Sequence, residues 1–350
     1  MRFYPWNLYW DALLASDAYL SSRDMRPLTF HVLKLLCEEE FRSGQALAHR
    51  LNVSRASVWG ALNEAQSAGM RIHRVHGRGY RLAERLDWLD ADKISRTVAD
   101  LGLVIEICEC CESTNATLIA MAEAGAQSGR VVAAELQTLG RGRLGRAWQS
   151  GLANALTFSL LWRFEKGIAG LGGLSLAVGV AVARVFRREG VQVELKWPND
   201  LFWHARKLGG VLIEVRGDAL GPCAAVIGVG LNVRLSPSER SRIDQPAADL
   251  VDAGAPALTR SEWLGKFLVE LATTLGVFAE RGFEHLCAEW SQYSAHQDKA
   301  VCLSLPDGTK VAGIARGVDE QGRLLIDRDG LIRAYLSADV SLRAAHDSGN

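Results

Sequence analysis

The stretch QTLGRGRLGRAW, residues 137–148, constrains the fold of this chain more than any other segment. Gly140, Gly142 and Gly145 have the spacing of a G-x-G-x-x-G dinucleotide turn, which closes a strand, opens a helix and needs an acidic residue about 20 positions later. The sequence QSGLANALTFSLLW follows instead, and it is typical of a loop and a strand, with an apolar residue where the acid should stand. Because Gly-Lys-Ser/Thr is also missing, the pattern favours neither a Rossmann domain nor a Walker A loop.

The arginines of this run, Arg141, Arg143 and Arg146, carry its chemistry. Guanidinium groups bind phosphate oxygens through two parallel hydrogen bonds, and glycine lets a backbone approach a ligand closely. We therefore expect a loop that becomes ordered over a polyphosphate. A basic surface turn is the alternative, but it leaves the regular alternation of Gly and Arg unexplained.

Length and composition set the wider frame. A chain of 350 residues exceeds what one hydrophobic core usually serves, so two or three domains are expected. The apolar N-terminal segment is interrupted by Asp11 and Asp17 and never reaches the ~18 consecutive apolar residues of a membrane span. The odd number of cysteines, with Cys108, Cys110 and Cys111 crowded together, favours reduced thiols in a cytosolic protein over disulfides or a zinc site. These features predict a cytoplasmic protein without zinc and without a membrane.

The N-terminal third has the pattern of a DNA-binding module. An amphipathic helix in RPLTFHVLKLLCEEEF is followed by a short helix after the N-cap Ser43 and a longer one from Ser54 to about Gly69. The basic segment 71–84 then alternates on both sides of a Gly-Arg-Gly turn, which predicts a hairpin wing. A helix-turn-helix followed by such a wing favours DNA as partner, although a winged helix used only for protein contacts remains an alternative. The candidate DNA-binding residues are Ser54, Arg55, Ser57, Arg74 and Arg78.

The rest of the chain mixes strands with helices without a strict βαβ repeat, which predicts the α+β class. Short strands with turns at Asp307-Gly308, Gly322 and Asp329-Gly330 predict a small C-terminal β-barrel. The expected parts are an extension over 1–26, a winged helix over 27–90, a central domain over 91–296 and a barrel over 297–350. The extension is either an amphipathic helix that packs on the winged helix or sequence upstream of a true start at Met25.

Five motifs in register resemble one family. They are ESTN at 112–115, GRGRLGRAW at 140–148, KWPND at 196–200, RKLGGVLIE at 206–214 and GVGLNV at 228–233. Their order and spacing are similar to those of the biotin protein ligases, and the outer parts resemble the bifunctional bacterial members that also repress the biotin operon. The resemblance implies a winged helix-turn-helix, a central mixed-sheet domain like those of class II synthetases, and a C-terminal SH3-like barrel. Lipoate ligases share the central fold but lack the GRGRxGR and KWPND motifs.

The resemblance also implies a reaction and partners. Biotin and ATP would form biotinyl-5′-adenylate and pyrophosphate, and the biotinyl group would then pass to a lysine of the biotin carboxyl carrier protein of acetyl-CoA carboxylase. Fixed cations and Mg²⁺ would offset the repulsion between the two anionic substrates, and an ordered loop would keep the adenylate from water. The adenylate-bound protein would be a homodimer that binds operator DNA.

Site residues follow from the motifs one by one. Those expected around biotin are Ser113, Thr114, Asn115, Gln137, Gly140, Arg141, Gly142, Arg143, Lys207 and Gly210, with Gly209 letting the strand pass close. Those expected around ATP or the adenylate are Arg141, Arg143, Arg146, Lys196, Asn199, Asn232 and Arg343. Lys207, Arg141 and Arg143 are the expected catalytic residues, and Asp200 is the expected Mg²⁺ ligand.

Some residues fit less well. Leu144 stands where some family members have arginine, while Trp148, Trp197 and Trp203 are interpreted as packing residues. Two alternative functions stay open: a ligase whose winged helix no longer regulates, and a repressor that senses biotin without catalysis. The intact Lys207 and arginine loop disfavour the second, since a sensor of biotin alone has no need to hold phosphates.

Overall fold

The computed structural model describes residues 25–305, 308–336 and 341–344, the last of these in backbone only. The expected N-terminal extension therefore lies almost entirely outside the described residues, and so do Asp307 and the side chain of Arg343. The chain divides between Glu84 and Arg85 into two compact units.

The first unit is a helix-turn-helix with a hairpin. Its elements are α2 (Pro27–Lys34), α3 (Gly44–Leu51), α4 (Arg55–Ser67), β1 (Ile72–Val75) and β2 (Gly79–Leu82). The predicted N-caps are confirmed, since Ser43 Oγ accepts from the Ala46 amide at 3.1 Å and Ser54 Oγ from the Ser57 amide at 3.0 Å. These bonds satisfy donors that the first turn of a helix otherwise leaves unpaired.

The hairpin wing of this unit depends on one glycine. A Cβ at Gly79 would lie 2.2 Å from the carbonyl oxygen of Arg42, because the two backbones pair through Arg42 and Tyr80. Only glycine permits this approach with φ of +107°. The wing is thereby fixed to the segment before α3.

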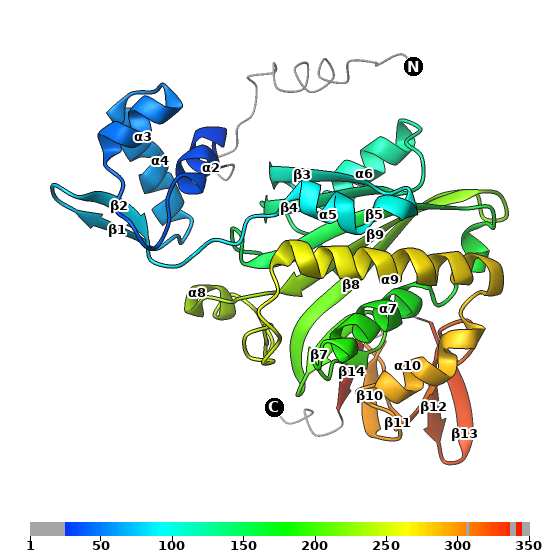
Figure 1. The fold of residues 1–350 in the computed structure, drawn as a ribbon. Helices are drawn as coiled ribbons and strands as arrows, with labels where there is room; N and C mark the ends of the chain where they lie inside the picture. The colour runs from blue at the N-terminus through cyan, green and yellow to red at the C-terminus, as the bar shows by residue number, and fades with distance from the viewer. Residues whose placement is uncertain (1–24, 306–307, 337–340, 345–350) are drawn as a thin grey trace. The chain divides into compact units, whose positions relative to one another are not determined.

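The second unit is built on a seven-stranded sheet of order β3-β4-β5-β9-β8-β7-β6 (Figure 1). The strands are β3 (Val104–Cys111), β4 (Arg130–Gln137), β5 (Ala155–Phe164), β6 (Glu194–Lys196), β7 (Asp200–Trp203), β8 (Arg206–Gly217) and β9 (Cys223–Asn232). Only β3 and β4 pair in parallel, with α6 (Thr114–Glu123) as their crossover. The sheet is therefore mixed, as the sequence predicted.

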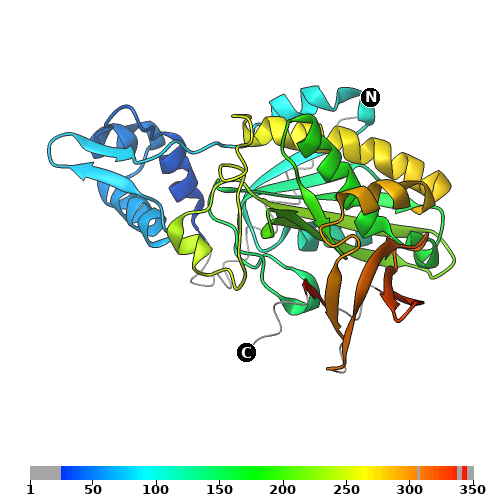
Figure 2. The ribbon, with the colours of Figure 1, turned by 90° about the horizontal axis from the view of Figure 1, so that it is seen from below.

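Helices cover both faces of this sheet. Residues of α6 pack with Val132, Leu161 and Val226, whereas α7 (Leu174–Arg188) and α9 (Arg260–Arg281) share a core with Val131, Leu160 and Ile227. Neighbouring strand residues point to opposite faces, so α6 lies opposite α7 and α9. Figures 1 and 2 show α7 and α9 side by side over the sheet.

Residues 168–188 are long and apolar enough to cross a membrane by length and composition alone. In the structure α7 is instead a core helix, most of whose side chains are buried. Phe186 on α7 packs against Trp263 and Phe267 on α9, with ring centroids 5.2 Å away in both cases. Its apolar character is explained by this packing.

The remaining elements complete the second unit. They are α5 (Ala91–Thr97), η1 (Ala99–Leu101), η2 (Arg143–Gly145), η3 (Ile168–Leu171), α8 (Pro237–Arg240), η4 (Glu284–Leu286), α10 (Cys287–Tyr293), β10 (Ala300–Ser304), β11 (Lys310–Val318), β12 (Leu324–Arg328), β13 (Leu331–Tyr335) and β14 (Ser341–Ala344). The last five strands form an antiparallel sheet of order β13-β12-β11-β10-β14. Asp329 and Gly330 both have positive φ at its predicted turn. The α+β class with a winged helix, a central mixed sheet and a C-terminal antiparallel sheet is confirmed.

Candidate active site

A cavity of about 500 Å³ opens over one end of the central sheet. This volume lies in the usual range for a small-molecule site. Most of the predicted site residues line it: Ser113, Thr114, Asn115, Gln137, Arg141, Gly142, Arg143, Arg146, Lys196, Asn199, Asp200, Lys207, Gly210 and Asn232. The fold therefore brings residues from all five motifs to one cavity.

One end of the cavity, which we call the head end, is formed by the start of α6 and the end of β4. Gln137 Oε1 accepts from the Thr114 amide at 2.8 Å and from its hydroxyl at 3.1 Å. Ser113 caps α6, since its Oγ accepts from the Ala116 amide at 3.5 Å. Among the described residues the Gln137 Nε2 amide has no hydrogen-bond partner, so it can donate to a ligand.

Both amide hydrogens of Asn115, at the head end, are donated to groups of the protein itself. Its Nδ2 donates to Glu214 Oε2 at 2.9 Å and to the Leu212 carbonyl at 3.3 Å, while Ser159 Oγ donates to its Oδ1 at 2.6 Å. A Cβ at Gly228 would lie 2.3 Å from Asn115 Oδ1, so glycine makes room for this amide. Asn115 therefore shapes the head end and offers no unpaired polar hydrogen to a ligand.

Ser159 and Glu214 are functional candidates that the sequence did not identify. Ser159 is fully buried on β5 and lies 2.7 Å from Thr114 Oγ1. A serine in the apolar run ALTFSLLW was the available signal, because a buried hydroxyl requires a partner. Glu214 closes the RKLGGVLIE motif and was assigned no role.

The Gly-Arg loop, residues 140–148, borders the cavity between β4 and β5. Gly140 does not line the cavity: a Cβ there would lie 2.5 Å from the Trp148 carbonyl oxygen, and its own carbonyl accepts from the Trp148 amide at 2.8 Å. The Gly142 amide donates to the Arg146 carbonyl at 2.7 Å, which closes the loop on itself. Leu144 has φ of +55° and is 73% exposed, so its side chain makes little contact with the rest of the protein.

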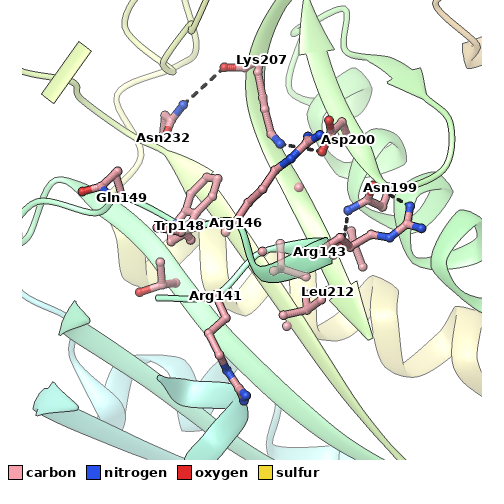
Figure 3. A pocket seen from close by; sticks show the side chains of 18 of the residues that line it. Arg141, Arg143, Arg146, Trp148, Gln149, Asn199, Asp200, Lys207, Leu212 and Asn232 are labelled. Carbon is pink, nitrogen blue, oxygen red and sulfur yellow. Dashed lines mark hydrogen bonds and ion pairs between the residues drawn. The ribbon is translucent and has the colours of Figure 1, made fainter. Parts of the chain in front are cut away.

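The three arginines of the loop point in different directions (Figure 3). Arg141 lies toward Glu214, with Nη2 to Oε2 at 3.1 Å, and Arg143 Nη1 lies 3.4 Å from Asn199 Oδ1. Arg146 extends toward the pair formed by Lys207 and Asp200. The loop thus contributes to both ends of the cavity.

The other end of the cavity, which we call the loop end, concentrates positive charge. Lys207 Nζ lies 2.7 Å from Asp200 Oδ1, and Lys196, Arg143 and Arg146 line the cavity around them. Burial lowers the pKa of the Arg143 guanidinium, Asp200 acts to raise it, and Arg146 acts to lower it. The cations at this end exceed the carboxylates close to them, which suits a multiply charged anion.

Two side-chain amides hydrogen-bond to backbone carbonyls at the loop end. Asn199 Nδ2 donates to the Val211 carbonyl at 2.7 Å, and Asn232 Nδ2 donates to the carbonyls of Lys207 at 3.3 Å and Ala248 at 3.0 Å. Both donor hydrogens of Asn232 are used, so only its Oδ1 is left for a nucleotide. Asn232 consequently fixes the backbone that carries Lys207.

Three expectations need adjustment. Gly209 was expected beside the ligand, but a Cβ there would lie 2.5 Å from the Gly230 carbonyl oxygen, so Gly209 serves the contact between β8 and β9. Trp148 was interpreted as packing only; it packs on Gly230 and also lines the cavity, with a buried Nε1 that has no partner among the described residues. Trp197 also lines the cavity edge, although it is buried and its Nε1 donates to the Gly322 carbonyl at 3.0 Å.

The expected DNA-binding residues lie in the first unit. Arg55 is exposed at the start of α4, whereas Ser54 and Ser57 hydrogen-bond each other at the N-cap. Arg74 Nη2 donates to Asn63 Oδ1 at 2.5 Å, and the Arg78 guanidinium lies 4.5 Å from the centroid of the Phe41 ring. Arg74 is thus held by a residue of α4 and Arg78 by a residue of the segment before α3, and both arginines are exposed.

Comparison with known proteins agrees with this architecture. The profile of the biotin/lipoate A/B protein ligase family matches residues 107–232, an HTH domain profile matches 29–81, and the biotin protein ligase C terminal domain matches 298–343. The bifunctional ligase/repressor BirA of Salmonella typhimurium is 36% identical over 91% of this chain and 98% of its own length. The protein of the same name from Escherichia coli is 34% identical over 90% and 97%.

A solved structure supports the assignment of the central domain. The biotin protein ligase from Aquifex aeolicus in complex with biotin and ATP has a TM-score of 0.58 and 29% identity, covering 69% of this chain and 99% of that chain. Similarity to the two BirA proteins extends over nearly their whole length. The chain therefore belongs to the biotin protein ligase family, and it has the domain content of the bifunctional ligase/repressors within that family.

Proposed function

We propose that this protein is an ATP-dependent biotin protein ligase. The observation that carries the proposal is the division of one cavity into a neutral, hydrogen-bonding head end and a cationic loop end. A ligand with an uncharged polar ring at one end and a carboxylate at the other matches that division. Biotin has this form, and the loop end has room and charge for the phosphates of ATP.

The reaction follows from these charges. A carboxylate oxygen of biotin attacks the α-phosphorus of ATP, the bond between the α-phosphorus and the bridging oxygen breaks, and pyrophosphate leaves. Lys207, Arg143 and Arg146 offset the negative charge that concentrates at the α-phosphoryl group, in a partly enclosed site where such charges act strongly. The ε-amine of a carrier lysine then attacks the biotinyl carbonyl, loses a proton, and releases AMP.

Each end of the cavity has a defined part in binding. Gln137 Nε2 donates to the ureido oxygen of biotin, while Thr114, Ser113 and Asn115 keep the head end in shape. Lys196, Asn199 and Asn232 serve the nucleotide, and the indole Nε1 of Trp148 is available to donate to a ligand. Arg343 is proposed to reach the adenylate from β14.

Magnesium would enter with ATP. Asp200 offers a carboxylate in the cavity with one oxygen 2.7 Å from Lys207 Nζ, which suits a metal held by one protein group together with substrate phosphates. Among the described residues no group of three or more His, Cys, Asp and Glu side chains forms a dedicated metal cage. When bound, the ion would neutralise phosphate charge.

The first unit extends the proposal to DNA. A cytoplasmic homodimer carrying the adenylate would place two recognition helices on a two-fold operator, with Arg55, Arg74 and Arg78 near DNA. The proposed domains are the winged helix over 27–90, the catalytic domain over 91–296 and a barrel-like domain over 297–350. The biotin carboxyl carrier protein is the proposed acceptor.

Two assays test these functions. The purified protein is incubated with biotin, ATP, Mg²⁺ and a biotin carrier domain, and mass spectrometry is expected to show one biotinylated lysine. An unmodified carrier would rule out the ligase. In a DNA-binding titration, adenylate-bound protein is expected to bind the operator more tightly than ligand-free protein; equal affinities would leave a ligase without biotin-responsive repression.

A further inference from the structure

A continuous chain of hydrogen bonds joins the head end to the Gly-Arg loop. Starting at the head end, Gln137 Oε1 accepts from the Thr114 amide at 2.8 Å, and the Thr114 hydroxyl lies 2.7 Å from Ser159 Oγ. Ser159 donates to Asn115, and Asn115 donates to Glu214 at 2.9 Å. Glu214 in turn binds Arg141 of the loop at 3.1 Å. Beyond the Thr114 amide the contacts are between side chains, and Thr114, Asn115 and Ser159 are buried.

Glu214 is the only carboxylate in this chain of contacts, and one of its atoms makes two of them. Its Oε2 accepts from Asn115 Nδ2 and from Arg141 Nη2. Its side chain is 21% exposed, compared with 44% for that of Arg141. A movement of either donor therefore changes the bond that the same oxygen forms with the other.

The carboxylate also determines how Asn115 is oriented. An amide side chain can rotate by 180° and exchange its oxygen for its nitrogen, and the hydrogen-bond network decides between the two positions. Glu214 and the Leu212 carbonyl are both acceptors, so they hold the Nδ2 side, which leaves Oδ1 for Ser159. A neutral side chain at 214 would remove the charge that fixes this choice.

We propose that Glu214 is a positioning residue that couples the head end to the Gly-Arg loop. It holds Arg141 against β8 and away from Lys207, as Figure 3 shows. It also keeps the head end preorganised for the uncharged ring of the ligand. Glu214 touches neither the α-phosphoryl group nor the carboxylate that reacts; it acts through Asn115 and Arg141. The inference rests on the proposed function only for the identity of the ligand.

The first test needs no ligand and no catalysis. Trypsin cleaves after arginine, so the rate of cleavage within residues 141–146 reports how firmly the loop is held. In Glu214→Gln the rate is expected to rise roughly tenfold over the unsubstituted protein, because one charge-assisted hydrogen bond is weakened. The matched control is Glu123→Gln, which removes an exposed partner of Arg216 at 3.4 Å and should leave cleavage unchanged. A rate equal to that of the unsubstituted protein would overturn the proposal.

Steady-state kinetics separate positioning from chemistry. Glu214→Gln is expected to raise the KM for biotin roughly tenfold, with kcat and the KM for ATP each changed less than about threefold. Glu214→Asp, which keeps the charge, should recover part of the biotin KM. A loss in kcat with an unchanged biotin KM, or an equal rise in the KM for ATP, would overturn the positioning role.

A second variant, in the Gly-Arg loop, tests the proposal if the first variant does not fold. If Glu214→Gln does not fold, Arg141→Gln breaks the same ion pair from an exposed position, and tryptic cleavage after Arg143 is expected to rise by the same factor. Unchanged cleavage in that variant would contradict the proposal. If the unsubstituted protein fails to biotinylate a carrier while the cleavage result is as expected, the proposed function fails and the coupling stands.

Discussion

The two ends of the cavity satisfy their polar groups in opposite ways. At the head end Asn115, Thr114 and Ser159 bond to one another and to neighbouring protein groups, so the protein itself sets the shape of this end. At the loop end Lys207, Arg143 and Arg146 line the cavity, and Asp200 pairs with Lys207. The head end is organised for a neutral group with fixed geometry. The loop end carries excess positive charge that a bound anion would neutralise.

Because of this difference, we expect the head end to govern the binding of biotin and the loop end to govern the rate of its reaction. Interactions that exist equally in the ground state and the transition state improve binding alone, whereas those that strengthen as charge develops accelerate the reaction. We expect substitutions at the head end to affect biotin affinity and stability. Substitutions at the loop end should instead affect the rate.

Lys207→Ala is expected to have the largest effect. The variant should lose roughly 10²- to 10³-fold in the rate of adenylate formation, as when one preorganised group for developing negative charge is removed. Biotin affinity without ATP should change much less. The control is Lys266→Ala, which removes a surface lysine with an equally close partner, Glu189 at 2.7 Å. Pyrophosphate release measures the rate, and a full rate in Lys207→Ala would break the comparison.

Asn115→Ala tests the head end. The substitution removes the acceptor of the Ser159 hydroxyl and one donor to the Glu214 carboxylate, so we expect a loss of about 1–3 kcal/mol in the free energy of unfolding together with weaker biotin binding. Urea denaturation and calorimetric titration with biotin measure these. Asn63→Ala, in the first unit, is the control and should leave biotin binding intact. Unchanged stability and biotin affinity in Asn115→Ala would show that the head end is not preorganised in this way.

Ionic strength should affect ligand binding at the two ends differently, without any mutation. The Debye length falls from about 10 Å at 0.1 M salt to about 3 Å at 1 M, which weakens interactions among partly exposed charges. We expect the KM for ATP to rise severalfold over that range, and the KM for biotin to rise less than about twofold. Equal sensitivity of the two constants would contradict the assignment of charge to one end.

The smallest expected effect is on the pH dependence of stability, and it involves His296, near Lys196 of the loop end. Burial, with Lys196 and Lys299 nearby, lowers the pKa of His296 to about 4. The unfolded chain therefore takes up this proton near pH 6.5, before the folded protein does, so stability should fall as the pH drops from about 6.5 to about 4. His296→Asn should flatten this part of the curve of unfolding midpoint against pH. A curve identical to that of the unsubstituted protein would exclude His296 as its source.

Sequence patterns predicted the elements that depend on local rules. The caps at Ser43 and Ser54 and the turn at Asp329-Gly330 follow from short-range chemistry, and the structure confirms them. The absence of a helix after the Gly-Arg loop correctly excluded a dinucleotide fold, since β5 follows it. Motif order also predicted most of the residues around the cavity.

The remaining features depend on three-dimensional packing. Gly209 and Gly210 are adjacent, but a strand directs them to opposite faces, and the sequence does not say which one faces the ligand. Ser159 and Glu214 acquire their roles only because β5 and β8 flank β9, which places both beside Asn115. Trp148 packs on a glycine of β9, a contact that no local pattern encodes.

The most direct test of the mechanism is the stoichiometry of the complete reaction. With biotin, ATP, Mg²⁺ and a carrier domain, the protein should release one AMP and one pyrophosphate for each biotinylated lysine, and Lys207→Ala should reduce all three together. Release of ADP and phosphate, or a carrier that stays unmodified while ATP is consumed, would contradict adenylation at the loop end.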